Sequence, residues 1–471
     1  MRVLLVHPPQ RLDRAQRELE NLMPPLNLLY LAGALKKAGH EVKVLDLYAS
    51  PRPPEEELEA MTAFKPELAG FATYPGSFDE TCRLVKALRT ASPGVFITLG
   101  GLYASYLPEI ALSQCPADAA VLGEGEVTIV HLAAAVADKS PLAKVSGLCY
   151  RRHNSTFRSA PRAPVANIDA IPWPAYDLID FDAYRLPPTR AVTRGRVSSV
   201  LSARGCNFNC SFCSHHYGLF CHIRSRKPED VVEEMRHVSR MYGVKEFRFE
   251  DCAFTAVPER AKKICALLKE RLPGIAWNCD ARADTASDEL FAAMAGAGCS
   301  RVFLGVETGS QKMLGELGAN KGIRLDQVRN AVALAKKYGM RVNCSFVLGL
   351  PGETRETAQE SLDFALELDP DYAMFAVLMP VVGSSIFEQA VKQGKINPAT
   401  YRGGHYLAAY AGAKDVVSMC DLPAGELVKL MHWFNKKFYS RPGYLLRRLF
   451  AVRSLAELKS LADGAMHIFP I

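Results

Sequence analysis

Short apolar runs separated by amphipathic segments dominate the first 150 residues. Between the runs, residues 26–39 and 78–91 carry apolar side chains at helical spacing. Five runs have the length and composition of buried strands, namely 2–6, 41–47, 68–73, 95–101 and 119–125. Buried strands that alternate with helices predict a parallel, doubly wound α/β domain. In such sheets, ligands bind beyond the carboxyl ends of the strands.

A second and more regular alternation begins near residue 196. Its six expected strands are 197–203, 245–251, 275–281, 301–307, 341–349 and 372–379. The helix expected over 228–243 places five apolar side chains on one face, those of Val231, Val232, Met235, Val238 and Met241. Six βα units of this length predict a barrel or partial barrel, with reactive groups at the carboxyl ends of the strands.

Prolines 161, 164, 172 and 174 interrupt the chain between these two regions and predict a linker. Beyond about residue 395 the βα rhythm is lost, and two helices are expected, over 424–439 and 454–465. We therefore predict a doubly wound domain over 1–150, a proline-rich linker over 151–195, a partial barrel over 196–395 and a small, mainly helical cap or lid over 396–471.

The composition indicates the location and the binding partners of the protein rather than any reaction that it catalyses. The net charge of +7 is spread along the chain, which gives no indication of nucleic-acid binding. No run of about 18 apolar residues occurs, and the apolar start is too short for a signal peptide. Together with 13 cysteines, these features predict a cytoplasmic, reducing location. The basic and aromatic stretch 434–454 either packs on the barrel or makes peripheral contact with anionic lipid.

Three cysteines follow the first expected barrel strand with the spacing C-x3-C-x2-C: Cys206, Cys210 and Cys213. Iron–sulfur cubanes take four cysteine ligands, so three thiolates leave one iron open to a substrate or cofactor. Two alternatives remain, a structural zinc site and an electron-transfer cluster with Cys221 as fourth ligand. The zinc site would draw on neighbouring His215, His216, Cys221 or His222.

This cysteine pattern, with the aromatic Phe212 before the last thiol, resembles the signature of radical S-adenosylmethionine (SAM) enzymes. The resemblance implies a 4Fe-4S cluster held by the three cysteines, with SAM bound to the open iron. It places Phe212 near the adenine, and Glu250 or Asp251 in "FEDCAFT" at the SAM amino group, although the family's usual sequence there is GGE. It further implies Arg282 at the SAM carboxylate, Glu307 at the ribose and the loop containing Gly349 beside the adenine.

The first 150 residues resemble the flavodoxin-like (Rossmann-type) cobalamin-binding domain that is joined to many radical SAM enzymes. The similarity covers residues 7–9, 24–46, 100–101 and 123–126. It implies that cobalamin contacts the loops containing Thr73, Tyr74, Gly100, Gly101, Gly123, Glu124 and Gly125. The chain lacks an Asp-x-His-x-x-Gly motif, so the resemblance implies base-off cobalamin without a histidine ligand. His7 is interpreted as a strand-end residue.

The two resemblances span residues 1 to about 395 and imply a methyltransferase acting on an unactivated carbon. In such enzymes one SAM methylates cob(I)alamin and a second gives the 5′-deoxyadenosyl radical. One rival with the same cofactors is radical cyclisation or rearrangement, as in anaerobic cyclisation of a magnesium-porphyrin ester. Another is a non-catalytic corrinoid-binding module. We expect a monomer, a small-molecule or lipid-like substrate, and a low-potential flavodoxin- or ferredoxin-like electron donor.

Overall fold

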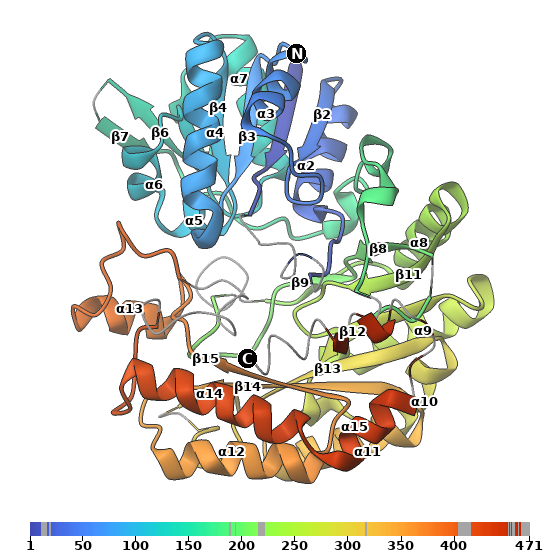
Figure 1. Cartoon of the computed structure of the whole chain (residues 1–471). Coiled ribbons are helices and arrows are strands. Elements are labelled where there is room, and N and C mark those ends of the chain that lie inside the picture. The colour runs from blue at the N-terminus through green and yellow to red at the C-terminus, as the bar shows by residue number, and fades with distance from the viewer. Residues whose placement is uncertain are drawn as a thin grey trace. The chain divides into compact units, whose positions relative to one another are not determined.

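The structure is a computed structural model (Figure 1). It describes residues 1–10, 17, 20–153, 155–187, 190–193, 195–214, 222–315, 318–403, 416–450, 452, 454, 457–459 and 461–462. The chain divides into two compact units. The first contains the N-terminal ten residues, Leu22–Tyr184 and a segment that begins at Val391, and the second contains the remainder.

Among the described residues, the first unit is built on a seven-stranded sheet with the order β2-β1-β3-β4-β5-β6-β7. Its strands are β1 Arg2–His7, β2 Glu41–Asp46, β3 Leu68–Ala72, β4 Phe96–Gly100, β5 Ala119–Val121, β6 Leu148–Arg152 and β7 Ser155–Arg158. The first five pair in parallel, and every residue of the central strand β3 is buried. This confirms the predicted parallel, doubly wound sheet.

Helices pack against the sheet of the first unit (Figure 1). They are α2 Leu26–Lys37, α3 Pro54–Thr62, α4 Phe78–Ala91, α5 Leu102–Tyr106, α6 Pro108–Gln114 and α7 Glu126–Ala137. Helix α4 shows the amphipathic pattern that the sequence indicated, because Phe78, Leu84, Val85 and Leu88 are fully buried while polar side chains lie between them.

The sheet of the first unit continues past residue 150, where the apolar pattern had placed the end of the domain. Strands β6 and β7 form an antiparallel hairpin that pairs with β5. Only Leu148 and Cys149 of this hairpin are buried, so its sequence has too few apolar positions to stand out as a strand pair. The proline-rich stretch also belongs to this unit, and it contains the short 3₁₀ turns Ile168–Ala170, Tyr176–Leu178 and Phe181–Ala183.

Arg402, far along the chain, packs against helices of the first unit. Its guanidinium donates to Asp79 Oδ1 at 3.0 Å, to Gln114 Oε1 at 2.9 Å and to the Tyr103 hydroxyl at 3.2 Å. It also lies 5.1 Å from the centre of the Phe78 ring. Gln114 Nε2 also donates to the Ala399 carbonyl at 2.7 Å, so this segment packs on the helices of the first unit through more than one contact.

Among the described residues, the second unit contains a six-stranded parallel sheet with the order β15-β14-β13-β12-β11-β8. Its strands are β8 Arg196–Val200, β11 Val244–Phe249, β12 Ala276–Ala281, β13 Cys299–Glu307, β14 Arg341–Leu348 and β15 Tyr372–Val377. Strands β8 and β15 are its two edges, as expected for a partial barrel. A separate two-stranded hairpin joins β9 Ala203–Arg204 to β10 Arg224–Ser225.

The two faces of this sheet differ in chemistry. One face is apolar and fully buried, with Phe247, Phe249, Trp277, Phe346 and Phe375 as its largest side chains. The other, which we call the polar face, follows from the strand register and includes Ser199, Glu246, Arg248, Asn278, Asp280, Arg301, Phe303, Arg341, Asn343, Ser345 and Tyr372. An ordinary barrel interior is filled by branched apolar residues, so the polar face is suited to contact ligands.

Helices pack along the strands of the second unit (Figure 1). They are α8 Pro228–Tyr242, α9 Pro258–Arg271, α10 Asp288–Gly296, α11 Leu325–Lys337, α12 Arg355–Leu368, α13 Ser385–Lys392, α14 Ala424–Tyr439 and α15 Pro442–Phe450. In α8, Val231, Val232, Met235 and Val238 are buried as predicted, but Met241 is 57% exposed and that prediction was wrong. At roughly 100° per residue, Met241 lies about 80° away from Val231 around the helix axis.

The C-terminal region contains one helix that the sequence predicted and one that it did not. Helix α14 has the expected bounds and packs on β15, where Phe434 and Phe375 meet edge to face at 5.4 Å. Helix α15 was not anticipated, and much of the helix predicted over 454–465 lies outside the described residues. Within the part of the chain that the structure describes, no helix has both the length and the apolar character needed to cross a bilayer.

Candidate active site

The cysteine loop follows β8 and β9, at the carboxyl end of the six-stranded sheet. Backbone contacts fix it: Ser211 N–H donates to the Ala319 carbonyl at 3.0 Å, and Asn320 Nδ2 donates to the Asn209 carbonyl at 2.9 Å. On its other side, Ser385 Oγ donates to the Ser211 carbonyl at 2.9 Å, at the start of α13. The loop that carries the three thiols is thus held by the segment after β13 and by the start of α13.

Arg282, at the end of β12, lies against the cysteine loop. Its guanidinium stacks 3.3 Å from the centre of the Phe208 ring, and Asp284 holds it through two hydrogen bonds of 2.9 and 2.8 Å. Its side chain is only 8% exposed, and Nη2 also donates to the Lys321 carbonyl at 3.1 Å. The structure therefore places this predicted carboxylate-binding residue directly beside the loop.

The thiols sit in a partly buried setting with positive charge nearby. Burial raises the pKa of Cys206 and raises that of Cys210 to about 11, while Arg282 and Lys321 act on both thiols in the opposite direction. A thiolate binds iron only in its charged form, so these two cations favour the ligating state. The structure thus brings Cys206 and Cys210 together with Arg282 and Lys321.

Glu307 ends β13 in a left-handed conformation, with φ of 67°. Its carboxylate is 8% exposed and pairs with Lys321 Nζ at 2.5 Å. The pair lies directly over the backbone of Gly305, where any side chain would collide with it. A strained non-glycine residue held by a buried ion pair at a strand end is typical of functional positions.

Glu250 and Asp280 lie on neighbouring strands around Arg248. The arginine donates to Asp280 Oδ2 at 2.7 Å and to Glu250 Oε2 at 3.3 Å, and Ser199 Oγ donates to Glu250 Oε1 at 2.9 Å. Burial raises the pKa of Asp280, which Arg248 opposes. Glu250 keeps an exposed carboxylate within this network, so it can still accept a bond from a ligand ammonium.

Asp251, the neighbouring candidate, already has protein partners at both oxygens. It accepts from the N–H groups of Ser202 at 2.7 Å and Ala203 at 3.1 Å, from Ser202 Oγ at 2.5 Å, and from Arg260 Nη2 at 3.1 Å. Its side chain is 1% exposed. These contacts fix the turn between β8 and β9, immediately before the cysteines, which is a positioning role.

Gly349 ends the fifth strand of the predicted barrel at a positive φ of 92°. Its N–H donates to Glu353 Oε2, which closes the turn. Glu353 is 1% exposed, and burial raises its pKa to about 7. An added side chain at Gly349 would press on Leu427 of α14 at 3.0 Å, so glycine is required for packing as well as for conformation.

The residues present fit a 4Fe-4S cluster better than a single metal ion. Within the described residues, no three His, Cys, Asp or Glu side chains converge on one point, whereas the cysteines of a cubane bind different irons. Phe212 is half-buried between two of the thiols. The alternative ligands His215, His216 and Cys221 lie outside the described residues, and His222 is exposed.

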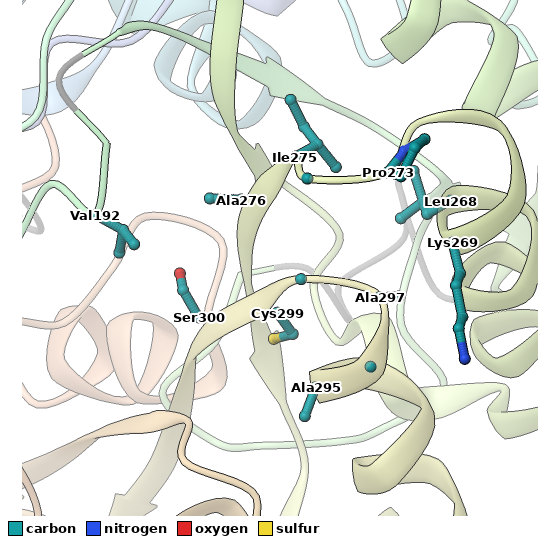
Figure 2. Close-up of a pocket in the computed structure, with 13 residues that line it drawn as sticks. Val192, Leu268, Lys269, Pro273, Ile275, Ala276, Ala295, Ala297, Cys299 and Ser300 are labelled. Atoms are coloured by element: carbon teal, nitrogen blue, oxygen red, sulfur yellow. The ribbon is translucent and has the colours of Figure 1, made fainter.

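A pocket of about 440 Å³ opens at the opposite end of the sheet, at the amino ends of β12 and β13 (Figure 2). Its lining is mostly small, with Gly296, Ala297 and Gly298 on one side and Pro273 and Gly274 on another. It contains no cluster of titratable side chains, Lys269 and Cys299 being its members with reactive groups. The candidate residues described above lie instead at the carboxyl ends of the strands, with the cysteine loop.

In the first unit, the predicted cobalamin-contacting residues follow three adjacent strands. Thr73 and Tyr74 follow β3, Gly100 and Gly101 end β4, and Gly123, Glu124 and Gly125 follow β5. Gly101 has a φ of 98°, and an added Cβ would lie 2.9 Å from the Thr73 carbonyl oxygen. At Gly100 an added Cβ would meet nothing within 4 Å. These loops form one surface at the carboxyl edge of the sheet.

Not all of these side chains are open to a ligand. Thr73 is buried and its Oγ1 donates to the Gly100 carbonyl at 2.7 Å, while Glu124 Oε2 accepts from the Val165 N–H at 2.7 Å. Both therefore shape the loops. Tyr74 is half-buried, and its hydroxyl accepts from Asn27 Nδ2 at 3.1 Å. Gly123 is held by a bond from its N–H to Ser105 Oγ at 3.0 Å.

His7 ends β1 and is held as a strand-end residue. Its Nδ1 lies 3.0 Å from Asp46 Oδ1, and Asp46 Oδ2 accepts from the Tyr184 hydroxyl at 3.0 Å. Burial acts to raise the pKa of Asp46, but the bonds from His7, Ala49 and Tyr184 outweigh it and the net shift is downward. The ring of His7 also lies 5.9 Å from that of Tyr74.

Sequence reasoning missed three residues of this site: Lys321, Phe208 and Arg248. Lys321 lies in the loop between β13 and α11, in "GANKGI", where nothing marks a lysine as different from a solvated one. Phe208 lies inside the cysteine motif but is not part of its spacing. Arg248 was visible as a charge inside an apolar strand, "FRF", which is the one signal that would have found it.

Two family models match the chain: the radical SAM superfamily over residues 200–365 and the B12 binding domain over residues 16–133. An uncharacterized methyltransferase of Pyrococcus horikoshii is 31% identical over 96% of this chain and 95% of its own. An anaerobic magnesium-protoporphyrin IX monomethyl ester cyclase of Rubrivivax gelatinosus is 29% identical over 83% of this chain and 70% of its own.

A solved structure shares the fold. The radical SAM methyltransferase TsrM from Kitasatospora setae, with cobalamin and a four-iron four-sulfur cluster bound, matches at a TM-score of 0.70 and 21% identity. The match covers 83% of this chain and 75% of that one. Both predicted domains are therefore present in their expected order, and the relative that is 31% identical extends over nearly the whole chain. The chain belongs to the cobalamin-dependent radical SAM enzymes, the family that includes these methyltransferases.

Proposed function

We propose that this enzyme methylates an unactivated carbon of its substrate and consumes two molecules of SAM in each turnover. One SAM would donate the methyl group and the other would give the radical that removes a hydrogen from the substrate. The observation that carries the proposal is the thiol loop, which leaves one ligand place open beside Arg282, Lys321 and Glu307. The similarity to methyltransferases favours methyl transfer among the reactions of the family.

In this proposal, Cys206, Cys210 and Cys213 hold the cluster. When bound, the cluster supplies the electron that cleaves SAM, and cobalamin carries the methyl group. Arg282 would bind the SAM carboxylate, because Asp284 and the Phe208 ring hold its guanidinium in one orientation. Glu250 would accept from the SAM ammonium.

The remaining contacts to SAM are proposed from the same strand ends. Glu307 would accept from the ribose hydroxyls, with Lys321 holding its carboxylate in place. The half-buried Phe212 and the turn at Gly349 would contact the adenine. Asp251 contributes by fixing the turn before the cysteines rather than by touching SAM.

For the first unit, we propose that the surface formed by Tyr74, Gly100, Gly101, Gly123 and Gly125 carries base-off cobalamin without a histidine ligand. Small residues at three adjacent strand ends allow a large flat ligand to approach the backbone. His7 is the histidine at this edge, and its Nδ1 is engaged by Asp46. A His7→Ala variant should therefore bind cobalamin with an unchanged absorption spectrum, and a changed spectrum would contradict this assignment.

Product analysis tests the proposed reaction. The protein is reconstituted anaerobically with iron, sulfide and cobalamin, then supplied with SAM, a low-potential flavodoxin- or ferredoxin-like donor and candidate small-molecule or lipid-like substrates. Methyl transfer predicts S-adenosylhomocysteine and 5′-deoxyadenosine in equal amounts with methylated product. Formation of 5′-deoxyadenosine and altered substrate without S-adenosylhomocysteine would favour cyclisation, the reaction of the Rubrivivax relative. Failure to cleave SAM at all would indicate a corrinoid-binding module.

A further inference from the structure

Several arginines gather at the amino-terminal end of the polar face, well away from the cysteine loop. Arg301 of β13 and Arg341 of β14 are register partners, so their side chains leave the sheet on the same face. Arg448 of α15 stacks 4.3 Å from the centre of the Tyr372 ring, and Arg301 lies 6.0 Å from the same ring. We call Arg301, Arg341 and Arg448 the arginine cluster.

Two nitrogens of the buried Arg301 guanidinium have no hydrogen-bond partner among the described residues. The residue is 2% exposed, and its Nε and Nη2 atoms have no hydrogen-bond partner there. Burial, with repulsion from Arg341 and Arg190, lowers the pKa of Arg301 to about 10, against the opposing effects of Glu246 and Asp371. Buried guanidinium groups in proteins are normally paired, so this one indicates a missing anion.

The nearby acids are engaged elsewhere. Glu246 Oε2 accepts from the N–H groups of Val192 at 2.9 Å and Thr193 at 3.1 Å, and Asp371 Oδ2 accepts from the Val342 N–H at 2.8 Å. Glu246 Oε1 is buried without a hydrogen-bond partner in the described part of the chain. Glu457 favours the charged form of Arg448. Four arginines, with Arg190 included, thus face three acids.

The geometry favours a tetrahedral anion over a planar one. A carboxylate is planar and pairs with one guanidinium fork, whereas the cluster offers forks from three separate elements, β13, β14 and α15. The side-chain Oδ1 of Asn343, two residues along β14, is also buried without a partner among the described residues. Turning that amide over would present a donor to the same ligand.

We propose that the arginine cluster binds the phosphate group of a small ligand. The site is separate from the SAM site, because Arg301 and Glu307 are six residues apart on β13, or roughly 20 Å at about 3.3 Å per residue. The proposal therefore does not depend on methyl transfer. A phosphate would accept from Arg301, Arg341 and Arg448 and satisfy the buried nitrogens of Arg301.

The test uses inorganic phosphate and the full-length protein. Melting temperature is measured against phosphate concentration, with sodium chloride holding the ionic strength constant, and ribose 5-phosphate is titrated in parallel. We expect phosphate to raise the melting temperature, and Arg301→Gln and Arg341→Gln each to weaken binding at least tenfold. Arg329→Gln, which removes an arginine from an exposed pair with Glu367, should bind as the wild type does.

Two results would overturn the proposal: a wild-type protein whose melting temperature ignores phosphate, or an Arg301→Gln variant that responds like the wild type. If Arg301→Gln folds poorly, the partly exposed Arg341 decides the matter. Glu246→Gln provides a further check, because removing an acid should preserve or strengthen phosphate binding. Loss of the phosphate response in Glu246→Gln would show that Glu246, not a ligand, organises the cluster. A stronger response to ribose 5-phosphate than to phosphate would support an organic phosphate as the ligand.

Discussion

Replacing Asp251 with alanine should destabilise the second unit and loosen the cysteine loop together. The carboxylate accepts four hydrogen bonds and pairs with Arg260, and the two side chains are 1% and 6% exposed. Solvent screening is therefore small. Removing one partner of a buried pair costs about 3–5 kcal/mol, because the remaining charge stays buried. Among the described residues, Arg260 would keep the Phe254 carbonyl at 2.8 Å, a weak contact to Ser225 at 3.4 Å and the Phe254 ring at 5.8 Å.

The assay is urea unfolding of the apo protein in a Trp173→Phe background. The chain has three tryptophans, so Trp277 and Trp433 then report on the second unit alone. Iron content after anaerobic reconstitution is the second readout, and it should fall because the turn of Ser202 and Ala203 precedes the cysteines. The matched control is Asp326→Ala, which removes an exposed aspartate from its pair with Arg324 and should cost about 0–1 kcal/mol. A loss below 1 kcal/mol for Asp251→Ala with full iron content would refute this reasoning.

Three further variants test separate parts of the structure. Gly101→Ala should destabilise the first unit by about 1–3 kcal/mol and weaken cobalamin binding, measured by calorimetry, because φ is 98° and the new Cβ meets the Thr73 carbonyl at 2.9 Å; unchanged binding would contradict the placement of this turn. Burial raises the pKa of Glu353 from 4.5 to about 7, so its contribution to stability is present below pH 4.5 and is lost as the pH rises to about 7. Glu353→Gln should flatten the dependence of urea midpoint on pH across that window, and an unaltered slope would count against it. Lys321→Met should raise the KM for SAM more than it lowers kcat by freeing the Glu307 carboxylate; the reverse pattern would argue that Lys321 acts in the chemical step.

The parallel strands were predictable because buried strands read as short continuous apolar runs. Residues 68–73 and 301–307 predicted β3 and β13 to within two residues at either end. The β6–β7 hairpin was missed because most of its side chains are not buried, so no apolar pattern marks it. Helix α15 was missed for a related reason, since its large side chains Leu445, Leu446 and Leu449 are more than half exposed.

The cysteines of the site were legible because their spacing within one loop carries chemistry by itself. Arg282 was also predicted, through the family resemblance. Lys321 was not, because its closeness to the thiols depends on how the loop after β13 meets the cysteine loop in space. Asp251 illustrates the same limit: it was predicted as the last residue of a strand and lies two residues beyond β11, but only its hydrogen bonds distinguish a positioning residue from a ligand-binding one. The position of a residue in the sequence predicts at which edge of the sheet it lies, whereas its hydrogen-bond partners decide its role.

The central claim is that three thiolates and no fourth hold a cluster open to SAM. The most direct measurement is iron content and SAM cleavage after anaerobic reconstitution of the wild type, of Cys210→Ala and of the matched control Cys344→Ala, whose thiol is buried on the apolar face. We predict about four irons per chain with SAM cleavage for the wild type and the control, and loss of SAM cleavage for Cys210→Ala. A Cys210→Ala variant that still cleaves SAM at the wild-type rate would contradict the account.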